Sequence, residues 1–186
     1  MFSIVVTISI AFLTGLLFSF LLTPLAGKLG ARFGALDRPN VRKVHTSAIP
    51  RTGGLAIIAT FFICRFLLLL AGETLGRFSV YWDSIGIFWI GVLFASGIGI
   101  VDDFKRVPSW IKLLMQVLAA TAAFLGGMRI EVFGITHVSW QFSFLTSYLL
   151  TVFWFVLLMN AINLIDGLDG LAAGVVIFGA AVMSIL

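Results

Sequence analysis

The sequence has few charged residues and a single cysteine, and each scarcity excludes a class of protein. Only 11% of the 186 residues are charged and 61% are hydrophobic, whereas soluble domains carry roughly a quarter charged residues. A water-soluble fold of this length could not bury so much apolar surface, so we predict an all-α polytopic membrane protein. Cys64 alone permits no disulfide within the chain, and the lack of a Cys or His cluster argues against a zinc site.

Basic residues are also missing from the N-terminal stretch, where the first is Lys28. A secretory signal opens with a positively charged segment, so we predict that this stretch is a retained helix. A membrane-spanning helix needs roughly 20 apolar residues. About six segments meet or approach that length and form a single transmembrane domain, residues 1–186: 2–22, 53–72, 84–101, 110–128, 141–159 and 171–186.

Lys and Arg residues concentrate on alternate connections between these segments. They cluster between the first two helices and after the third, whereas the opposite connections carry only Arg77 and Arg129. The positive-inside rule then predicts that segments 23–52, 102–109 and 160–170 are cytoplasmic and that the N-terminus is outside. Apolar and charged residues alternate at the start of 128–140, which predicts a short strand on the outer side.

The first cytoplasmic segment contains "LDRPNVRKVHTSAIPRTGG". His45 and Arg51, beside Pro50 and a glycine pair, are candidates for binding a substrate. The basic residues could instead serve only to orient the chain or to bind anionic lipid headgroups.

Asp102 and Asp103 fall at the cytoplasmic end of the third predicted helix. Adjacent carboxylates repel each other and oppose the C-terminal dipole of a helix, so a positive group must compensate them. That group could be a bound cation, or simply Lys105 and Arg106 around a solvated pair.

The stretch "NAINLIDGLDGLAAG" places Asp166 and Asp169 close to hydrocarbon with no basic residue nearby. Such charges cost several kcal/mol unless they are paired, so their partner comes from elsewhere in the protein or from a bound cation. Gly167 and Gly170 favour a broken helix here over a continuous one. Four carboxylates on one side of the membrane, with oxygen ligands only, suit Mg²⁺ and are typical of phosphoryl transfer.

Four stretches of the sequence, taken together, resemble a known family. The stretches "RKVHTSAIPRTGG", "VDDF", "KLLMQ" and "NAINLIDGLDGLAAG" together resemble the polyprenyl-phosphate N-acetylhexosamine-1-phosphate transferases, which share a superfamily with the phospho-MurNAc-pentapeptide transferases. The "PRTGG" form is closer to the N-acetylglucosamine-phosphate enzymes. The resemblance implies transfer of a sugar-1-phosphate from a UDP-sugar to a polyprenyl phosphate such as undecaprenyl phosphate. UMP leaves, and the reaction initiates cell-envelope glycan synthesis.

The resemblance also implies roles for individual residues. Asp102, Asp103 and Asp166 match catalytic positions, with Asp103 and Asp166 as ligands of Mg²⁺ or Mn²⁺. The substrate-binding candidates are His45, Arg51, Lys112, Asn163 and Asp169. The implied location is the bacterial plasma membrane, with the site on the cytoplasmic face. The partners would be the lipid acceptor, a UDP-N-acetylhexosamine and membrane lipids; no nucleic acid is expected, and the tryptophans suit a homodimer interface or a lipid annulus.

The family carries further helices, a G-D-x-G-S aspartate and a histidine-rich motif that would follow Leu186. We therefore expect this chain to be the N-terminal part of a longer transferase. Two alternatives remain open. One is a truncated, non-catalytic or split-subunit form. The other is an ion-coupled transporter, in which Arg65 within an apolar segment would be a counter-charge.

Overall fold

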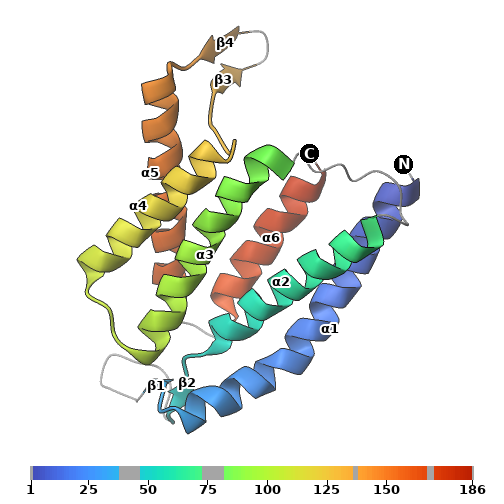
Figure 1. Ribbon diagram of the computed structural model, residues 1–186, viewed down its shortest axis with the longest axis vertical. Helices are drawn as coiled ribbons and strands as arrows, with labels where there is room; N and C mark the ends of the chain where they lie inside the picture. The colour runs from blue at the N-terminus through green and yellow to red at the C-terminus, as the bar shows by residue number, and fades with distance from the viewer. Residues whose placement is uncertain (1, 38–46, 73–81, 136–137, 167–169, 186) are drawn as a thin grey trace. The chain divides into compact units, whose positions relative to one another are not determined.

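The computed structural model describes residues 2–37, 47–72, 82–135, 138–166 and 170–185, and most of them are helical (Figure 1). The elements in chain order are α1 (Phe2–Arg32), β1 (Leu36–Asp37), β2 (Ile49–Pro50), α2 (Gly53–Gly72), α3 (Trp82–Phe104), α4 (Ser109–Leu125), β3 (Val132–Ile135), β4 (Val138–Gln141), α5 (Phe144–Ile165) and α6 (Leu171–Ile185).

The helices have the composition that a bilayer requires. In the described part of the chain, three stretches are long and apolar enough to cross a membrane, namely Ile8–Arg32, Gly86–Phe104 and Phe144–Ile165. Shorter apolar helices cover Gly53–Leu68, Ser109–Leu125 and Leu171–Val182. The prediction of a helical polytopic membrane protein is confirmed, whereas the outside location of its N-terminus stays a prediction.

The first helix is longer than predicted, because it passes Pro24 and ends at Arg32. A proline removes one backbone hydrogen bond from a helix, and a single loss does not end this 31-residue helix. The end comes at Gly34, whose φ of +73° is left-handed. There the amide of Ala35 donates to the carbonyl of Gly30 at 2.9 Å, the closing bond of a glycine C-cap.

Two other segments that were predicted to be loops are helical at their start. The segments 102–109 and 160–170 were both expected to be loops, yet α3 continues to Phe104 and α5 to Ile165. The bounds of α2, in contrast, agree with the predicted segment 53–72. The predicted break of the helix is confirmed at Gly170, which has a φ of +79° and follows the end of α5 at Ile165, whereas Gly167 lies outside the described residues.

The chain divides into two compact units. The first contains α1, β1, β2, α2 and both ends of α3, and the second contains the middle of α3 together with α4, β3, β4, α5 and α6. The expectation of a single transmembrane domain over residues 1–186 stays a prediction.

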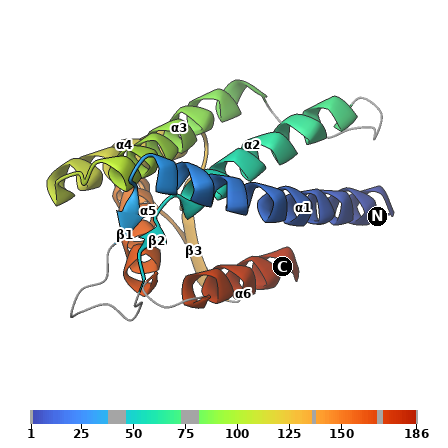
Figure 2. The ribbon, with the colours of Figure 1, turned by 90° about the horizontal axis from the view of Figure 1, so that it is seen from below.

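In the first unit, α1 and α2 pack side by side (Figures 1 and 2). The strands β1 and β2 pair antiparallel, with Leu36 opposite Pro50. Thr52 is fully buried, and its hydroxyl donates to the carbonyl of Ala26 at 2.6 Å. The start of α2 is therefore fastened to the last turns of α1.

In the second unit, α4 packs through small residues. The buried positions of α4 are Ala119, Ala120, Ala122, Ala123 and Phe124. A Cβ added at Gly91 of α3 would lie only 2.7 Å from the carbonyl oxygen of Ala119, so the two backbones approach closely. On α5, the hydroxyl of Tyr148 lies 3.1 Å from that of Thr121.

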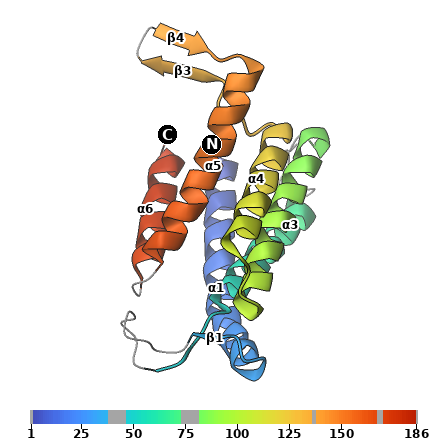
Figure 3. The ribbon, with the colours of Figure 1, turned by 90° about the vertical axis from the view of Figure 1, so that its left-hand side faces the viewer.

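A β-hairpin extends beyond the end of α4 and the start of α5 (Figure 3). It pairs β3 with β4 in antiparallel register, with Phe133 opposite Trp140. The prediction of a short strand within 128–140 is confirmed, but the strand begins at Val132. The preceding residues instead close α4, since the amide of Met128 donates to the carbonyl of Ala123 at 3.0 Å. The outer-side location of the hairpin stays a prediction.

Candidate functional site

The first unit brings together two of the polar segments. The Nη2 atom of Arg51, just before α2, lies 3.5 Å from Oδ2 of Asp102, in the last turn of α3. The two side chains are about one quarter and one fifth exposed. Oδ1 of Asp102 accepts a 2.9 Å hydrogen bond from the amide of Val107. The positive group that the aspartate pair requires therefore includes Arg51, which comes from the first loop.

The neighbouring carboxylate of Asp103 faces the start of α2. Its Oδ2 lies 3.9 Å from where a Cβ would stand on Gly54. The ring of Phe104 packs edge-on against Phe33 at 6.2 Å, so the end of α3 also contacts the end of α1. We refer to Arg51, Asp102 and Asp103 as the α2–α3 cluster.

The second unit brings together a different pair of motifs. Nδ2 of Asn160, near the end of α5, donates to Oε1 of Gln116 on α4 at 2.8 Å and to the carbonyl of Val156 at 2.8 Å. Lys112 lies one helical turn before Gln116, and Asn163 lies three residues after Asn160. The antiparallel helices α4 and α5 therefore carry these residues at the same end of the pair.

Asp166 follows at this end, as the C-cap of α5. Its amide donates to the carbonyl of Ile162 at 3.0 Å, and the residue is exposed, as is Asn163. We refer to Lys112, Gln116, Asn160, Asn163 and Asp166 as the α4–α5 cluster. Carboxylate and amide groups gather here at the ends of apolar helices, where a polar ligand can be bound at the surface of a membrane.

Two of the predicted site residues, His45 and Asp169, lie outside the described residues. Among those described, no three His, Cys, Asp or Glu side chains come together as a metal site would require. Asp103 and Asp166 belong to different units, so their shared metal site stays a prediction. The sequence predicted no individual role for Gln116 or Asn160, although both lie in the quoted motifs. Their hydrogen bond depends on how α4 packs against α5, so only the structure reveals it.

The comparisons with known proteins agree with the motifs. Residues 85–186 match the model of glycosyl transferase family 4. The chain is 35% identical over 182 residues to a probable undecaprenyl-phosphate N-acetylglucosaminyl 1-phosphate transferase of Bacillus subtilis, covering 97% of this chain and 48% of the relative. No solved structure matches this chain.

Two further relatives carry similar names. A decaprenyl-phosphate N-acetylglucosaminephosphotransferase of Mycobacterium leprae is 34% identical, with 87% of this chain and 41% of the relative covered. An undecaprenyl-phosphate alpha-N-acetylglucosaminyl 1-phosphate transferase of Thermotoga maritima is 33% identical, with 87% and 47% covered. The chain thus spans about half the length of the curated relatives it matches. The motifs, the apolar helices and the family match together show that the chain belongs to glycosyl transferase family 4.

Proposed function

We propose that the protein transfers N-acetylglucosamine-1-phosphate from UDP-N-acetylglucosamine to a polyprenyl phosphate. An oxygen of the lipid phosphate attacks the sugar-proximal phosphorus of the donor. The bond from that phosphorus to the bridging oxygen breaks, UMP leaves, and a lipid-linked diphosphosugar remains. The names of the relatives and the "PRTGG" sequence support this sugar and this acceptor. The reaction would start cell-envelope glycan synthesis at the cytoplasmic face of the bacterial plasma membrane.

The observation that carries this proposal is the gathering of the motif residues into two polar clusters. Residues far apart in the sequence meet in each cluster, as the Arg51–Asp102 ion pair and the Gln116–Asn160 hydrogen bond show. Phosphoryl transfer depends mainly on positioning and on stabilising charge, so it needs such fixed polar groups more than a covalent nucleophile.

The residues present fit a magnesium ion. The described carboxylates and amides of the two clusters offer oxygen ligands, and hard oxygen ligands are what Mg²⁺ or Mn²⁺ prefers. Asp103 and Asp166 would hold the ion. When bound, it would offset the negative charge of the donor diphosphate.

The chain's own residues supply binding and orientation. Asp102 fixes the turn after α3 and holds Arg51, so both groups are set in place before the substrates bind. A guanidinium carries five N–H donors, and the ion pair with Asp102 does not use all of them. Arg51 would therefore still have donors for an anionic substrate. Lys112 and Asn163, in the α4–α5 cluster, would contact the nucleotide.

The test is transfer by the protein and by its Asp166→Asn variant. The chain would be expressed alone and in a chimaera in which it replaces the matching half of the B. subtilis relative. Membranes would receive labelled UDP-N-acetylglucosamine and undecaprenyl phosphate, and UMP release and labelled lipid would be measured. We expect transfer in at least one format and a loss of roughly 100-fold or more with Asp166→Asn, since a charged ligand is removed.

The matched control is Asp83→Asn, the same substitution at the opposite end of α3 from Asp103, which should leave transfer near its original rate. Transfer by the Asp166→Asn variant at a near-normal rate would contradict the metal role. Absence of UMP release in both formats would contradict the proposed reaction.

A further inference from the structure

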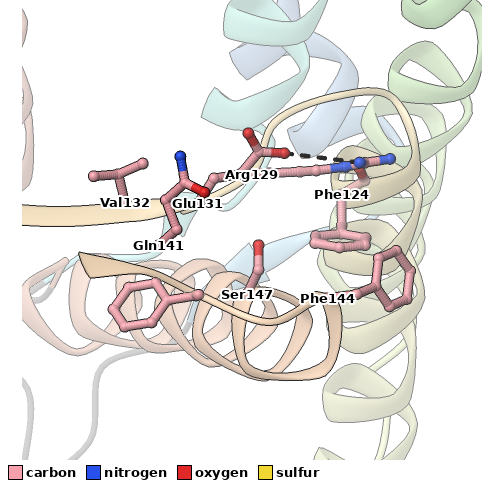
Figure 4. Close-up of a pocket in the computed structure, with 8 residues that line it drawn as sticks. Phe124, Arg129, Glu131, Val132, Gln141, Phe144 and Ser147 are labelled. Carbon is pink, nitrogen blue, oxygen red and sulfur yellow. Dashed lines mark hydrogen bonds and ion pairs between the residues drawn. The ribbon is translucent and has the colours of Figure 1, made fainter. Parts of the chain in front are cut away.

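The second unit contains a pocket at the end of the α4–α5 pair opposite the α4–α5 cluster. It has a volume of about 300 Å³ and lies between the last turn of α4, the β-hairpin and the first turn of α5 (Figure 4). Its lining includes the charged groups of Arg129 and Glu131, the polar groups of Gln141 and Ser147, and the rings of Phe124 and Phe144. Nothing in the proposed transfer reaction uses these residues.

Ser147 provides evidence that the pocket receives a ligand. The residue is only 3% exposed, and its Oγ has no hydrogen-bond partner within the described part of the chain. Figure 4 shows the hydroxyl pointing between Arg129, Glu131 and Gln141. A buried hydroxyl without a partner is costly, and native structures rarely leave one unsatisfied.

The neighbouring threonine shows that backbone groups of the protein can satisfy the hydrogen bonds of a buried hydroxyl in this region without a ligand. Thr151, one turn further along α5, accepts a hydrogen bond from the amide of Ile130 at 3.0 Å and donates to the carbonyl of Ser147 at 2.7 Å. The fold thus pairs one hydroxyl completely and leaves the other directed into the pocket.

Arg129 is held in a fixed orientation at the pocket. Its Nε donates to the carbonyl of Phe124 at 3.0 Å, which caps the C-terminus of α4, and its guanidinium lies 4.8 Å from the centre of the Phe124 ring. Nη1 lies 3.8 Å from a carboxylate oxygen of Glu131, which is largely exposed. A positive and a negative group therefore stand next to each other, and a ligand that carries both charges complements them.

The depth of the pocket in a bilayer indicates the class of ligand. The 22 residues of α5 extend for about 33 Å, close to the roughly 30 Å thickness of a hydrocarbon core. The first turn of α5 then lies at the level of the lipid headgroups. On the hairpin, the exposed ring of Trp140 stacks on that of Phe133 at 6.3 Å, and tryptophan is enriched at membrane interfaces.

We propose that this pocket binds the headgroup of a zwitterionic phospholipid. The phosphate would accept hydrogen bonds from Arg129 and Ser147, and the ammonium would pair with Glu131. Phe144, which lines the pocket and is 67% exposed, would contact the apolar part of the lipid. None of the residues that line the pocket belongs to the clusters of the proposed transferase, and its occupancy can be measured without any assay of transfer.

The first experiment measures binding to the purified full chain in detergent micelles. Phosphatidylethanolamine would be titrated, with native mass spectrometry to count bound lipids and thermal unfolding to measure stabilisation. We expect one tightly held phosphatidylethanolamine and weaker binding of phosphatidylglycerol, whose headgroup lacks the ammonium. Free phosphoethanolamine should bind much more weakly than the lipid; equal binding would overturn the proposal in favour of a soluble ligand.

The second experiment uses Ser147→Ala, with Ser139→Ala on the exposed strand β4 as its matched control. Loss of a hydrogen bond to a charged phosphate should weaken lipid binding about tenfold. The unfolding temperature without lipid should stay the same or rise, because an unpaired buried hydroxyl is removed. Unchanged lipid affinity, or a weakening equal to that of the control, would overturn the proposal.

A third variant, Glu131→Gln, tests the ammonium contact independently. Its exposed side chain makes a folding defect unexpected. We expect this variant to lose the preference for phosphatidylethanolamine over phosphatidylglycerol while it still binds phospholipid. A preference as large as that of the original protein would show that Glu131 does not recognise the ammonium of the headgroup. It would refute the proposal that the ligand is a zwitterionic phospholipid.

Discussion

The described contacts of Asp102 hold neighbouring groups in position. One of its carboxylate oxygens holds the amide of Val107 in the turn after α3, and the other faces Arg51 before α2. A carboxylate used in this way positions its surroundings. We therefore propose that Asp102 orients the turn after α3 and that Asp103 is the metal ligand; the catalytic role that the motif implies for Asp102 stays a prediction.

The contacts of Asp102 predict a graded loss of stability. Asp102→Ala should lower the free energy of unfolding by about 1–3 kcal/mol, because the amide of Val107 loses a charged acceptor. Asp102→Asn should cost less, since its amide oxygen can still accept that hydrogen bond. Both values can be measured by denaturant unfolding in mixed micelles.

A double-mutant cycle with Arg51→Ala separates the ion pair from the turn. For a partly exposed pair at 3.5 Å we expect a coupling energy of about 0.5–1 kcal/mol. Strictly additive effects of the two alanine substitutions would show that the pair contributes nothing to stability.

At the scale of elements, one amide pair joins α4 to α5 at the α4–α5 cluster. Asn160 donates to Gln116 and is partly buried, whereas Asn163, one turn later, is exposed. The first asparagine thus fixes the spacing of the helices, and the second is the one that we propose contacts the nucleotide.

This difference predicts opposite phenotypes for two similar substitutions. Asn160→Ala should lower the free energy of unfolding by about 1–2 kcal/mol, because Gln116 loses its partner. Asn163→Ala should leave stability within about 0.5 kcal/mol and raise the KM for the UDP-sugar. Unfolding in micelles and steady-state kinetics measure the two effects; equal losses of stability would argue against separate roles.

The elements also show which features the sequence can predict. Helix positions follow from apolar runs, and α2 agrees with its predicted bounds because glycines stand at both ends. The predicted end of the first helix, residue 22, was wrong because the segment was measured as an apolar run of membrane-spanning length, whereas the left-handed Gly34 is what ends α1. Motif recognition found the polar residues but not their pairing. Gln116 and Asn160 are 44 residues apart, and their contact depends on which faces α4 and α5 present to each other.

At the scale of the whole molecule, the distribution of basic residues predicts the orientation in the membrane. The hairpin should lie outside and the turn after α3 inside. In a Cys64→Ala background, Ser139→Cys should react with an impermeant thiol reagent in intact cells. Lys105→Cys should react only after permeabilisation. Labelling of Lys105→Cys in intact cells would contradict the orientation and the cytoplasmic location of the proposed site.

Because the start of α2 is bonded to α1, we expect Gly30 of α1 to tolerate no side chain. A Cβ at Gly30 would collide with the hydroxyl of Thr52, the residue that follows Arg51 and bonds to Ala26. Any side chain at position 30 would displace this threonine and, with it, the arginine that faces Asp102. A genetic screen for inactive alleles should therefore recover substitutions at Gly30, a position outside the quoted motifs that inspection of those motifs alone would pass over.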